Sequence, residues 1–367
     1  APVRTWNKLG ISTASSLSMG NTLFTLASDC SVALTNPALL TRLSSFTFTI
    51  SSSYSSASLF KYSIVNTGVL GTKENQSVGL YAIDFLGASM THKGWAFAFN
   101  YGILEHYDRP VTGSRFSEGE SLVYQMNFRQ KGELKSINLA LARKISKGVS
   151  LGFGINYVTG NSEKSISEEL YWLDITISDE KNYDIDGFYL NGGLAADLSE
   201  RLTLSAMFRT SYERKADSKS LLRFHSPQGN TDIRIEASAN SIYKQPMVLG
   251  LGINYKLAHN FLMVSELSFF NWSKYEVNFF GEDMKRKFNN TVRIGAGLEN
   301  FSSFKMFNQE GKIPFRFGIC YDPQPMKEPN SYYLIFSFGT GLHWENFFLD
   351  LGIHTGGENG SGDELTA

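Results

Sequence analysis

Segments of strict alternation recur along most of this chain, each with one apolar face and one face of small or charged residues. In 149–158 the apolar face reads Val149, Leu151, Phe153, Ile155 and Tyr157, and the other face reads Ser150, Gly152, Gly154, Asn156 and Val158. Segments 247–256, 292–299 and 315–322 repeat this design. Because successive strand residues point to opposite faces, the pattern predicts an all-β fold.

The lengths of the connections indicate how the strands are arranged. We expect strands near 45–59, 76–90, 94–106, 120–145, 149–160, 183–198, 202–215, 242–257, 260–279, 288–301, 312–322, 331–343 and 345–356. Short turns alternate with longer polar connections at 60–75, 107–119, 161–182 and 216–232, and only 302–311 breaks the order. Short turns on one rim and long loops on the other are typical of outer-membrane barrels.

The strand ranges come to thirteen, whereas bacterial single-chain barrels have even numbers. Either 120–145 is two strands, or a last strand after Gly357 is missing from this chain, and the order of turns favours the second alternative. A soluble sandwich or a lipocalin-like barrel is disfavoured because the strands are too many for one small barrel. We therefore predict a transmembrane antiparallel up-and-down β-barrel of about 14 strands.

Composition limits the other classes of protein. Lys plus Arg number 34 against 35 Asp plus Glu, so no charge field points to nucleic acid as a partner. No apolar run approaches the roughly 18 residues of a transmembrane helix, so a membrane protein of this sequence would have to be a barrel. The N-terminus, Ala1-Pro2-Val3-Arg4, has no export-signal pattern. We take the chain to be mature and expect it in the outer membrane of a diderm bacterium.

A different pattern precedes the first strand. Residues 17–40 are rich in small side chains and contain Met19-Gly20, Asp29 and Asn36-Pro37-Ala38. Proline removes a donor and biases the residue before it away from helix, so this motif is suited to end the segment. The order resembles the FadL family of outer-membrane channels for hydrophobic compounds, in which such a segment folds inside the barrel as a plug. The resemblance implies that the hatch, over 1–44, plugs the barrel expected over 45–357. The tail over 358–367 is polar, and we expect no strand there.

Three later segments carry the same resemblance in order: 142–157, 246–255 followed by Asn271-Trp272-Ser273, and 314–325. It implies passive uptake of hydrophobic compounds such as long-chain fatty acids, with plug-gated capture and lateral release into the membrane. In the family the exit is a kink in the third strand, for which Gly102 is the candidate here. PorV-like relatives imply the alternative, a protein-binding component of a secretion system. The candidate contact is then the 161–182 connection, with Tyr171-Trp172-Leu173.

The candidate site residues lie in the hatch and on the inner faces of strands. The hatch motif is Gly20, Asp29, Asn36, Pro37 and Ala38, and the candidate ligand contacts are Leu17, Met19, Leu23, Phe24 and Leu26, which could equally pack against the wall. Six charged residues are expected to face the lumen: Arg209, Glu266, Arg293, Glu299, Arg316 and Asp350. They could contact a carboxylate headgroup or line a permeation path. The favoured alternative is a lumen network that pins the hatch, because charges inside a barrel pair with each other or with the plug.

No feature of the chain indicates an enzyme. Its six histidines have no ligand spacing, and no Gly-x-Ser-x-Gly motif occurs, so we expect no metal, no cofactor and no catalytic residue. The expected partners are membrane lipids, a hydrophobic small-molecule ligand and, in the alternative, proteins bound by the outer loops. Nucleic acid is not expected.

Cys30 in the hatch and Cys320 on an inner face are both expected inside the barrel. A disulfide between them would tether the plug to the wall. Two separate small apolar residues are the favoured alternative, because sharing a lumen does not bring two Cα atoms within the roughly 7 Å that a bridge requires.

Overall fold

The computed structural model describes residues 13–60, 75–118, 121–279, 282–284, 288–306, 309–328 and 330–361. Eighteen strand segments form one antiparallel sheet. Their bounds are β1 Phe46–Phe60, β2 Asn75–His92, β3 Trp95–His106, β4 Arg109–Glu118, β5 Ser121–Ser146, β6 Val149–Leu170, β7 Ile175–Asp197, β8 Leu202–Arg209, β9 Tyr212–Ser226, β10 Thr231–Gln245, β11 Val248–Ala258, β12 Phe261–Phe270, β13 Glu276–Phe279, β14 Glu282–Met284, β15 Thr291–Met306, β16 Gln309–Pro323, β17 Asn330–Trp344 and β18 Phe347–Ser361. The predicted all-β fold is confirmed.

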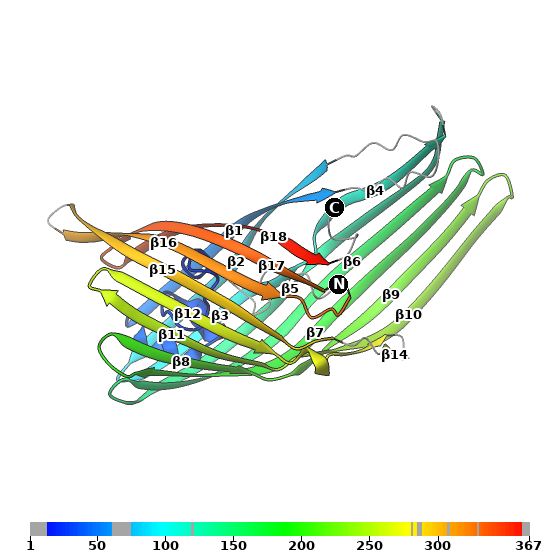
Figure 1. Cartoon of the computed structure of the whole chain (residues 1–367). Helices are drawn as coiled ribbons and strands as arrows, with labels where there is room; N and C mark the ends of the chain where they lie inside the picture. The colour runs from blue at the N-terminus through cyan, green and yellow to red at the C-terminus, as the bar shows by residue number, and fades with distance from the viewer. Residues whose placement is uncertain are drawn as a thin grey trace.

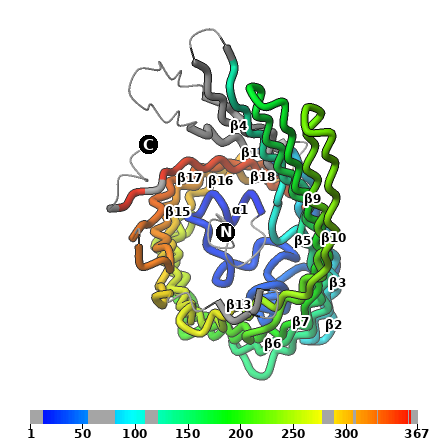
Figure 2. The backbone as a smooth tube through the Cα atoms, turned by 90° about the vertical axis from the view of Figure 1, so that its right-hand side faces the viewer, coloured from blue at the N-terminus to red at the C-terminus, as the bar shows by residue number. Residues whose placement is uncertain are grey.

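The sheet curls into the wall of a barrel (Figures 1 and 2). Along the chain β4 follows β3, β9 follows β8, β11 follows β10, β13 follows β12, and β14 leads into β15, so the described segments make thirteen wall strands. Each wall strand pairs with the next in an antiparallel ladder. Among these residues β1 pairs only with β2 and β18 only with β17, which leaves one unpaired seam. Both seam strands leave the short-turn rim, so they run in the same direction.

The outer face of the lower wall is apolar. Phe97, Phe153 and Leu251 are among the large exposed side chains, with 51%, 49% and 65% of their surface accessible. Alternate residues on the same strands are buried and small or polar, as the alternation predicted. No helix within the described ranges is long and apolar enough to cross a membrane.

Several predicted connections are strands instead. β6 and β7 run through the expected 161–182 loop and meet at a turn over 171–174, and β9 and β10 likewise take up most of 216–232. β4 occupies most of 107–119. These predictions were wrong because the upper strands have polar outer faces, which were interpreted as loops. Most of the predicted 60–75 connection lies outside the described residues.

Two further boundaries differ from expectation. The 302–311 connection, expected to be long, belongs almost entirely to β15 and β16, so that the order of short turns is unbroken. β18 continues to Ser361 and takes four residues that were assigned to the polar tail. The 120–145 segment is one strand, β5, which agrees with the alternative that turn order favoured.

The barrel is longer on one side than on the other. β5, β6, β7, β9 and β10 extend far beyond the level at which β16–β18 end, as the right-hand side of Figure 1 shows. We call this extension the protruding wall. The hatch lies inside the ring, near the opposite, short-turn rim (Figures 1 and 2).

Candidate functional site

The hatch consists of one short helix and two 3-10 helices: α1 Ala14–Ser18, η1 Cys30–Leu34 and η2 Pro37–Arg42. Asp29 caps η1, since its Oδ1 accepts from the Ser31 backbone N–H at 2.8 Å. Its Oδ2 accepts from the Thr13 hydroxyl at 2.6 Å, which ties the start of α1 to η1. One carboxylate therefore holds two parts of the hatch together.

Asn36 and Pro37 define the second turn of the hatch. The Asn36 Oδ1 accepts from the Ala38 backbone N–H at 3.2 Å. Pro37 occupies the first position of η2, where a backbone N–H would have no partner within the helix. The Asn36 Nδ2 donates to the Phe24 carbonyl at 3.0 Å and to the Leu194 carbonyl of β7 at 3.2 Å. The Asn-Pro-Ala motif thus shapes the hatch and joins it to the wall.

Gly20 and Asn21 form a left-handed turn, with φ of +72° and +56°. Asparagine is the non-glycine residue best suited to this region, which explains how Asn21 stands where the resembled family often has glycine. A Cβ at Gly20 would lie 2.2 Å from the Ala296 carbonyl oxygen, so the turn presses directly on β15. The turn can adopt this position only with glycine at residue 20.

The inner faces of the strands are glycine because the hatch backbone lies on them. A Cβ at Gly318 would be 1.8 Å from the Gly20 backbone N, and one at Gly297 would be 2.5 Å from the Met19 carbonyl oxygen. Similar overlaps with the hatch arise at Gly152, Gly193, Gly252, Gly295, Gly339 and Gly352. The recurring Gly-x-Gly faces of the sequence are therefore a seat for the hatch.

Glu266 and Arg293 hold the middle of the hatch. The buried Glu266 carboxylate accepts from the Leu23 and Phe24 backbone N–H groups at 2.7 and 2.8 Å and from the Thr25 hydroxyl at 2.5 Å. The Arg293 guanidinium donates to the Asn21 carbonyl at 2.6 Å. Both side chains come from the predicted lumen set and meet hatch backbone.

The other charged residues of that set separate into two places. Arg316 donates to Glu299 at 2.5 Å and to Asp350 at 2.6 Å, and His343, which the sequence analysis did not include, lies 2.9 Å from the same Asp350 oxygen. Arg209 lies apart from this cluster, with its guanidinium 5.7 Å from the Tyr189 ring centre. The six residues therefore lie in several separate places along the inner wall.

A row of asparagines crosses four neighbouring strands, and sequence reasoning missed it. The Nδ2 groups of Asn100, Asn138 and Asn156 donate in turn to the next side chain, at 2.9, 2.9 and 2.7 Å. Asn191 ends the row and donates to the Ala33 carbonyl of η1 at 2.9 Å. All four are fully buried. One inner-facing asparagine on each of four successive strands was the signal that could have revealed the row.

We expect Asn156→Leu to lower the free energy of unfolding by about 2–5 kcal/mol, because two buried amide neighbours lose their partner. The measurement is the urea midpoint of the purified protein in lipid vesicles. Asn182→Leu, on the exposed outer face of β7, is the control and should leave the midpoint nearly unchanged. Equal midpoints for the two variants would show that the row does not stabilise the wall.

Most of the candidate ligand contacts in the hatch pack against the wall. Leu23 and Phe24 belong to a cluster with Met207, Val248, Phe270, Trp272 and Tyr275. Met19 packs with Leu262 and Val264, and Leu26 packs at the edge of that cluster. Leu17 is partly exposed. A ligand would reach Met19 or Phe24 only if the hatch moved.

β2 and β3 separate above the hatch. Their ladder runs from the His92–Trp95 pair to the Phe85–Gly102 pair and goes no further within the described residues. Both strands carry a bulge beyond that point: Asp84 is the extra residue of β2 against β1, and Leu104 is the extra residue of β3 against β5. Gly102, the predicted kink, is thus the last residue of β3 that pairs with β2, and the register shift of β3 lies two residues further on, at Leu104. We call the unpaired stretch the lateral gap.

The lining of the lateral gap comes from the wall and the hatch. Phe85 packs with Cys30 and Leu34 of the hatch, and Leu104 lies against the same cluster. The His106 Nε2 lies 3.0 Å from the Asp84 Oδ1 and spans the gap from β3 to β2. The lateral gap is therefore bordered by apolar side chains and crossed by one His–Asp contact.

Cys30 and Cys320 form no disulfide with each other, and both are fully buried. The Cys30 Sγ donates to the Thr47 carbonyl of β1 at 3.3 Å, whereas Cys320 lies on β16 opposite Gly295. Burial raises the pKa of the Cys30 thiol and keeps it protonated. The favoured alternative, two separate small residues, is the one found.

The inner face of the protruding wall carries most of its large apolar side chains, together with Lys164, Glu168, Asp179 and Lys181. Paired strand residues share a face, and the inner set contains Tyr124, Met126, Phe128, Ile166, Leu170, Ile175, Ile177, Leu222, Phe224, Ile233 and Ile235. The outer set at the same level includes Arg129, Glu163, Glu180, Lys219, Arg223 and Arg234. The large apolar side chains thus lie inward at this level, whereas on the lower wall they lie outward. In the described part of the chain, no group of three His, Cys, Asp or Glu side chains could hold a metal ion.

This geometry, a hatch seated in a barrel with an apolar outer face, is that of the FadL type of outer-membrane channel. Among solved structures, the CymD monoaromatic hydrocarbon channel matches with a TM-score of 0.67 at 13% identity, over 97% of this chain and 94% of that one. A Pseudomonas aeruginosa FadL homologue matches with a TM-score of 0.63 at 15% identity, over 96% and 91%. The Ralstonia pickettii toluene transporter TbuX matches with 0.58 at 11%, over 95% and 98%. These matches concern the fold.

The BamG family model matches residues 10–361, and the chain belongs to the BamG family. None of the curated proteins compared with the chain matches it.

Proposed function

We propose that this protein is an outer-membrane channel for passive uptake of hydrophobic compounds, long-chain fatty acids among them, with lateral release into the membrane. The observation that carries the proposal is the lateral gap. Unpaired backbone inside lipid costs several kcal/mol per group, so a stretch where β2 and β3 part is suited to a passage and not to a sealed wall. Phe85 and Leu104 give this passage an apolar lining.

The protruding wall supports the capture step. Its inner face offers apolar side chains such as Phe128, Ile177 and Phe224 above the hatch, where an apolar solute leaving water would gain about 25 cal/mol per Å² of buried surface. The hatch closes the lumen below this face. Its residues Cys30 and Leu34 pack with Phe85 of β2 in a cluster that borders the lateral gap. A solute held above the hatch thus has an apolar route sideways.

Joining β2 to β3 across the gap is expected to abolish uptake. The variant Asp84→Cys with His106→Cys, treated with a short reducible bis-thiosulfonate, should reduce the accumulation of labelled oleate and toluene to that of cells lacking the protein. Reduction should restore it. The assay uses cells that have no other uptake system for these compounds.

The matched control is Ala88→Cys with Phe99→Cys, a pair that faces across the intact part of the ladder. The same reagent should leave its uptake unchanged, because these strands are already joined. Unchanged uptake in the cross-linked gap variant would contradict lateral release. Absence of uptake by the wild-type protein would contradict the channel itself.

A second candidate function is that of a protein-binding barrel of the PorV-like kind. The observation that favours it is the turn between β6 and β7, where Trp172 is 65% and Tyr171 45% exposed at the tip of the protruding wall. Exposed aromatic side chains in such a position are frequent anchors of protein contacts.

If this function holds, Tyr171→Ala with Trp172→Ala should remove a stoichiometric protein partner from pull-downs of the intact membrane complex. Gln228→Ala, in the neighbouring turn between β9 and β10, is the control and should retain the partner. A wild-type protein that brings down lipid but no stoichiometric protein would exclude this role.

A further inference from the structure

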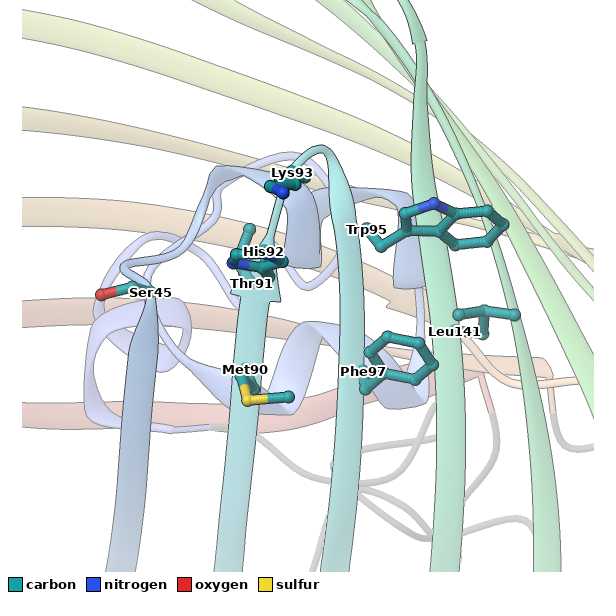
Figure 3. Close-up of a pocket in the computed structure, with 8 residues that line it drawn as sticks. All are labelled: Ser45, Met90, Thr91, His92, Lys93, Trp95, Phe97 and Leu141. Carbon is teal, nitrogen blue, oxygen red and sulfur yellow. The ribbon is translucent and has the colours of Figure 1, made fainter.

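The outer face of the wall is hollowed beside the turn between β2 and β3. A cavity of about 720 Å³ is lined by Ser45, Met90, Thr91, His92, Lys93, Trp95, Phe97 and Leu141 (Figure 3). A second cavity of about 530 Å³ shares Met90, Phe97 and Leu141 with the first and continues along the wall to Phe153 and Ile155. Together they form one outer groove that runs from the short-turn rim up the apolar face.

The body of the outer groove is apolar. Met90, Phe97 and Leu141 project from three neighbouring strands and are 54%, 51% and 40% exposed. Figure 3 shows Met90 and Phe97 at one level, with Leu141 beyond them and the turn residues above. Small residues, Ala88, Ala98 and Ala140, also line the upper cavity. A long, narrow apolar groove on a membrane-facing surface has the shape of an acyl chain.

The mouth of the outer groove is basic. His92 and Lys93 line it, and the Arg143 guanidinium lies 4.6 Å from the centre of the Trp95 ring. The Lys144 backbone N–H donates to the Gly94 carbonyl at 2.7 Å. This hydrogen bond holds the end of β5 beside the mouth of the groove. The segments 86–99 and 139–153 contain no Asp or Glu. The groove therefore joins an apolar body to a cationic end.

We propose that the outer groove binds an anionic phospholipid of the periplasmic leaflet. The short-turn rim is the periplasmic one in outer-membrane barrels, which puts His92, Lys93 and Arg143 at headgroup level. An acyl chain lies along Met90, Phe97 and Leu141, and the phosphate lies among the basic groups. Each lysine or arginine at an anionic surface strengthens binding about fivefold. The site lies outside the wall and is independent of what the lumen carries.

The test is native mass spectrometry of the full-length protein, with phosphatidylglycerol and phosphatidylcholine supplied in equal amounts. Wild type should retain phosphatidylglycerol in preference. Lys93→Ala with Arg143→Ala should weaken phosphatidylglycerol binding about 25-fold, one factor of five for each charge. Arg201→Ala with Lys256→Ala removes the same charge from the turn before β8 and from the end of β11, at the same rim, and should leave the preference unchanged. All of these side chains are on the surface, and heat-modifiable migration checks that each variant folds.

A second readout places the lipid. Brominated phosphatidylglycerol should quench the fluorescence of Trp95 more strongly than brominated phosphatidylcholine, and the difference should disappear in Trp95→Phe. Equal retention of the two lipids, or undiminished phosphatidylglycerol binding by the double variant, would overturn the proposal. So would a protein partner that cross-links at Phe97 and displaces the lipid.

Discussion

Replacing Gly318 with valine is expected to unseat the hatch and convert the plugged barrel into an open pore. A Cβ at this position would lie 1.8 Å from the Gly20 backbone N and 2.4 Å from the Met19 carbonyl carbon. Both are backbone atoms, so no side-chain rotation relieves the overlap. Overpacking costs about 1–3 kcal/mol where side chains can adjust, and here the expected cost is at the upper end or beyond.

The measurement is single-channel conductance in planar bilayers. Gly318→Val should show a large ohmic conductance that the wild-type protein lacks, and cells that carry it should become sensitive to bulky polar antibiotics. Gly357→Val is the matched control, because a Cβ there has nothing within 4 Å. A Gly318→Val protein as poorly conducting as wild type would show that the hatch is not held by this contact.

Replacing Glu266 with alanine is expected to loosen the hatch while leaving the wall intact. The change leaves the Leu23 and Phe24 N–H groups buried without their acceptor, at about 1–3 kcal/mol each. Hydrogen exchange at these two amides should accelerate by about a hundredfold or more. Amides of the β5–β6 ladder should exchange as in wild type.

Two variants sharpen this test. Glu266→Gln keeps one acceptor oxygen and should show a smaller acceleration, which separates the loss of hydrogen bonds from the loss of charge. Glu276→Ala removes a carboxylate whose side chain is 71% exposed and should change nothing. Wild-type exchange at Leu23 and Phe24 in Glu266→Ala would show that other contacts alone position this part of the hatch.

The wall could be predicted from sequence wherever its outer face contacts lipid, because the outward residues must be apolar there. In β11 and over 149–157 of β6 every second residue is large and apolar, and both segments were predicted as strand. The rule ends where the strands leave the membrane. In the upper part of β7 the outward residues include Glu180, Asn182 and Asp184, so the strand resembles a polar loop. The apolar face turned inward there, and only the pairing of strands reveals it.

The site could be predicted only in outline. The lumen glycines and the charged set were expected on inner faces, because alternation determines the face of each residue. Their partners depend on the register between strands, which the sequence does not give. For the same reason the Asn100–Asn191 row and the place of His343 beside Asp350 were missed. The bulge at Leu104, two residues beyond the predicted Gly102, depends on a mismatch between β3 and β5.

The contacts of the hatch also determine when it can fold. Gly20 donates its backbone N–H to the Ser337 hydroxyl, 317 residues later in the chain, and α1 packs against β18. The hatch, which precedes the wall in the chain, therefore docks after nearly all of the wall has formed. Contacts of such sequence separation form slowly, because the chain entropy of closing the loop must be overcome first. The hatch can therefore dock fully only on a correctly assembled barrel. A barrel with a missing or misregistered C-terminal strand lacks part of the surface that the hatch binds.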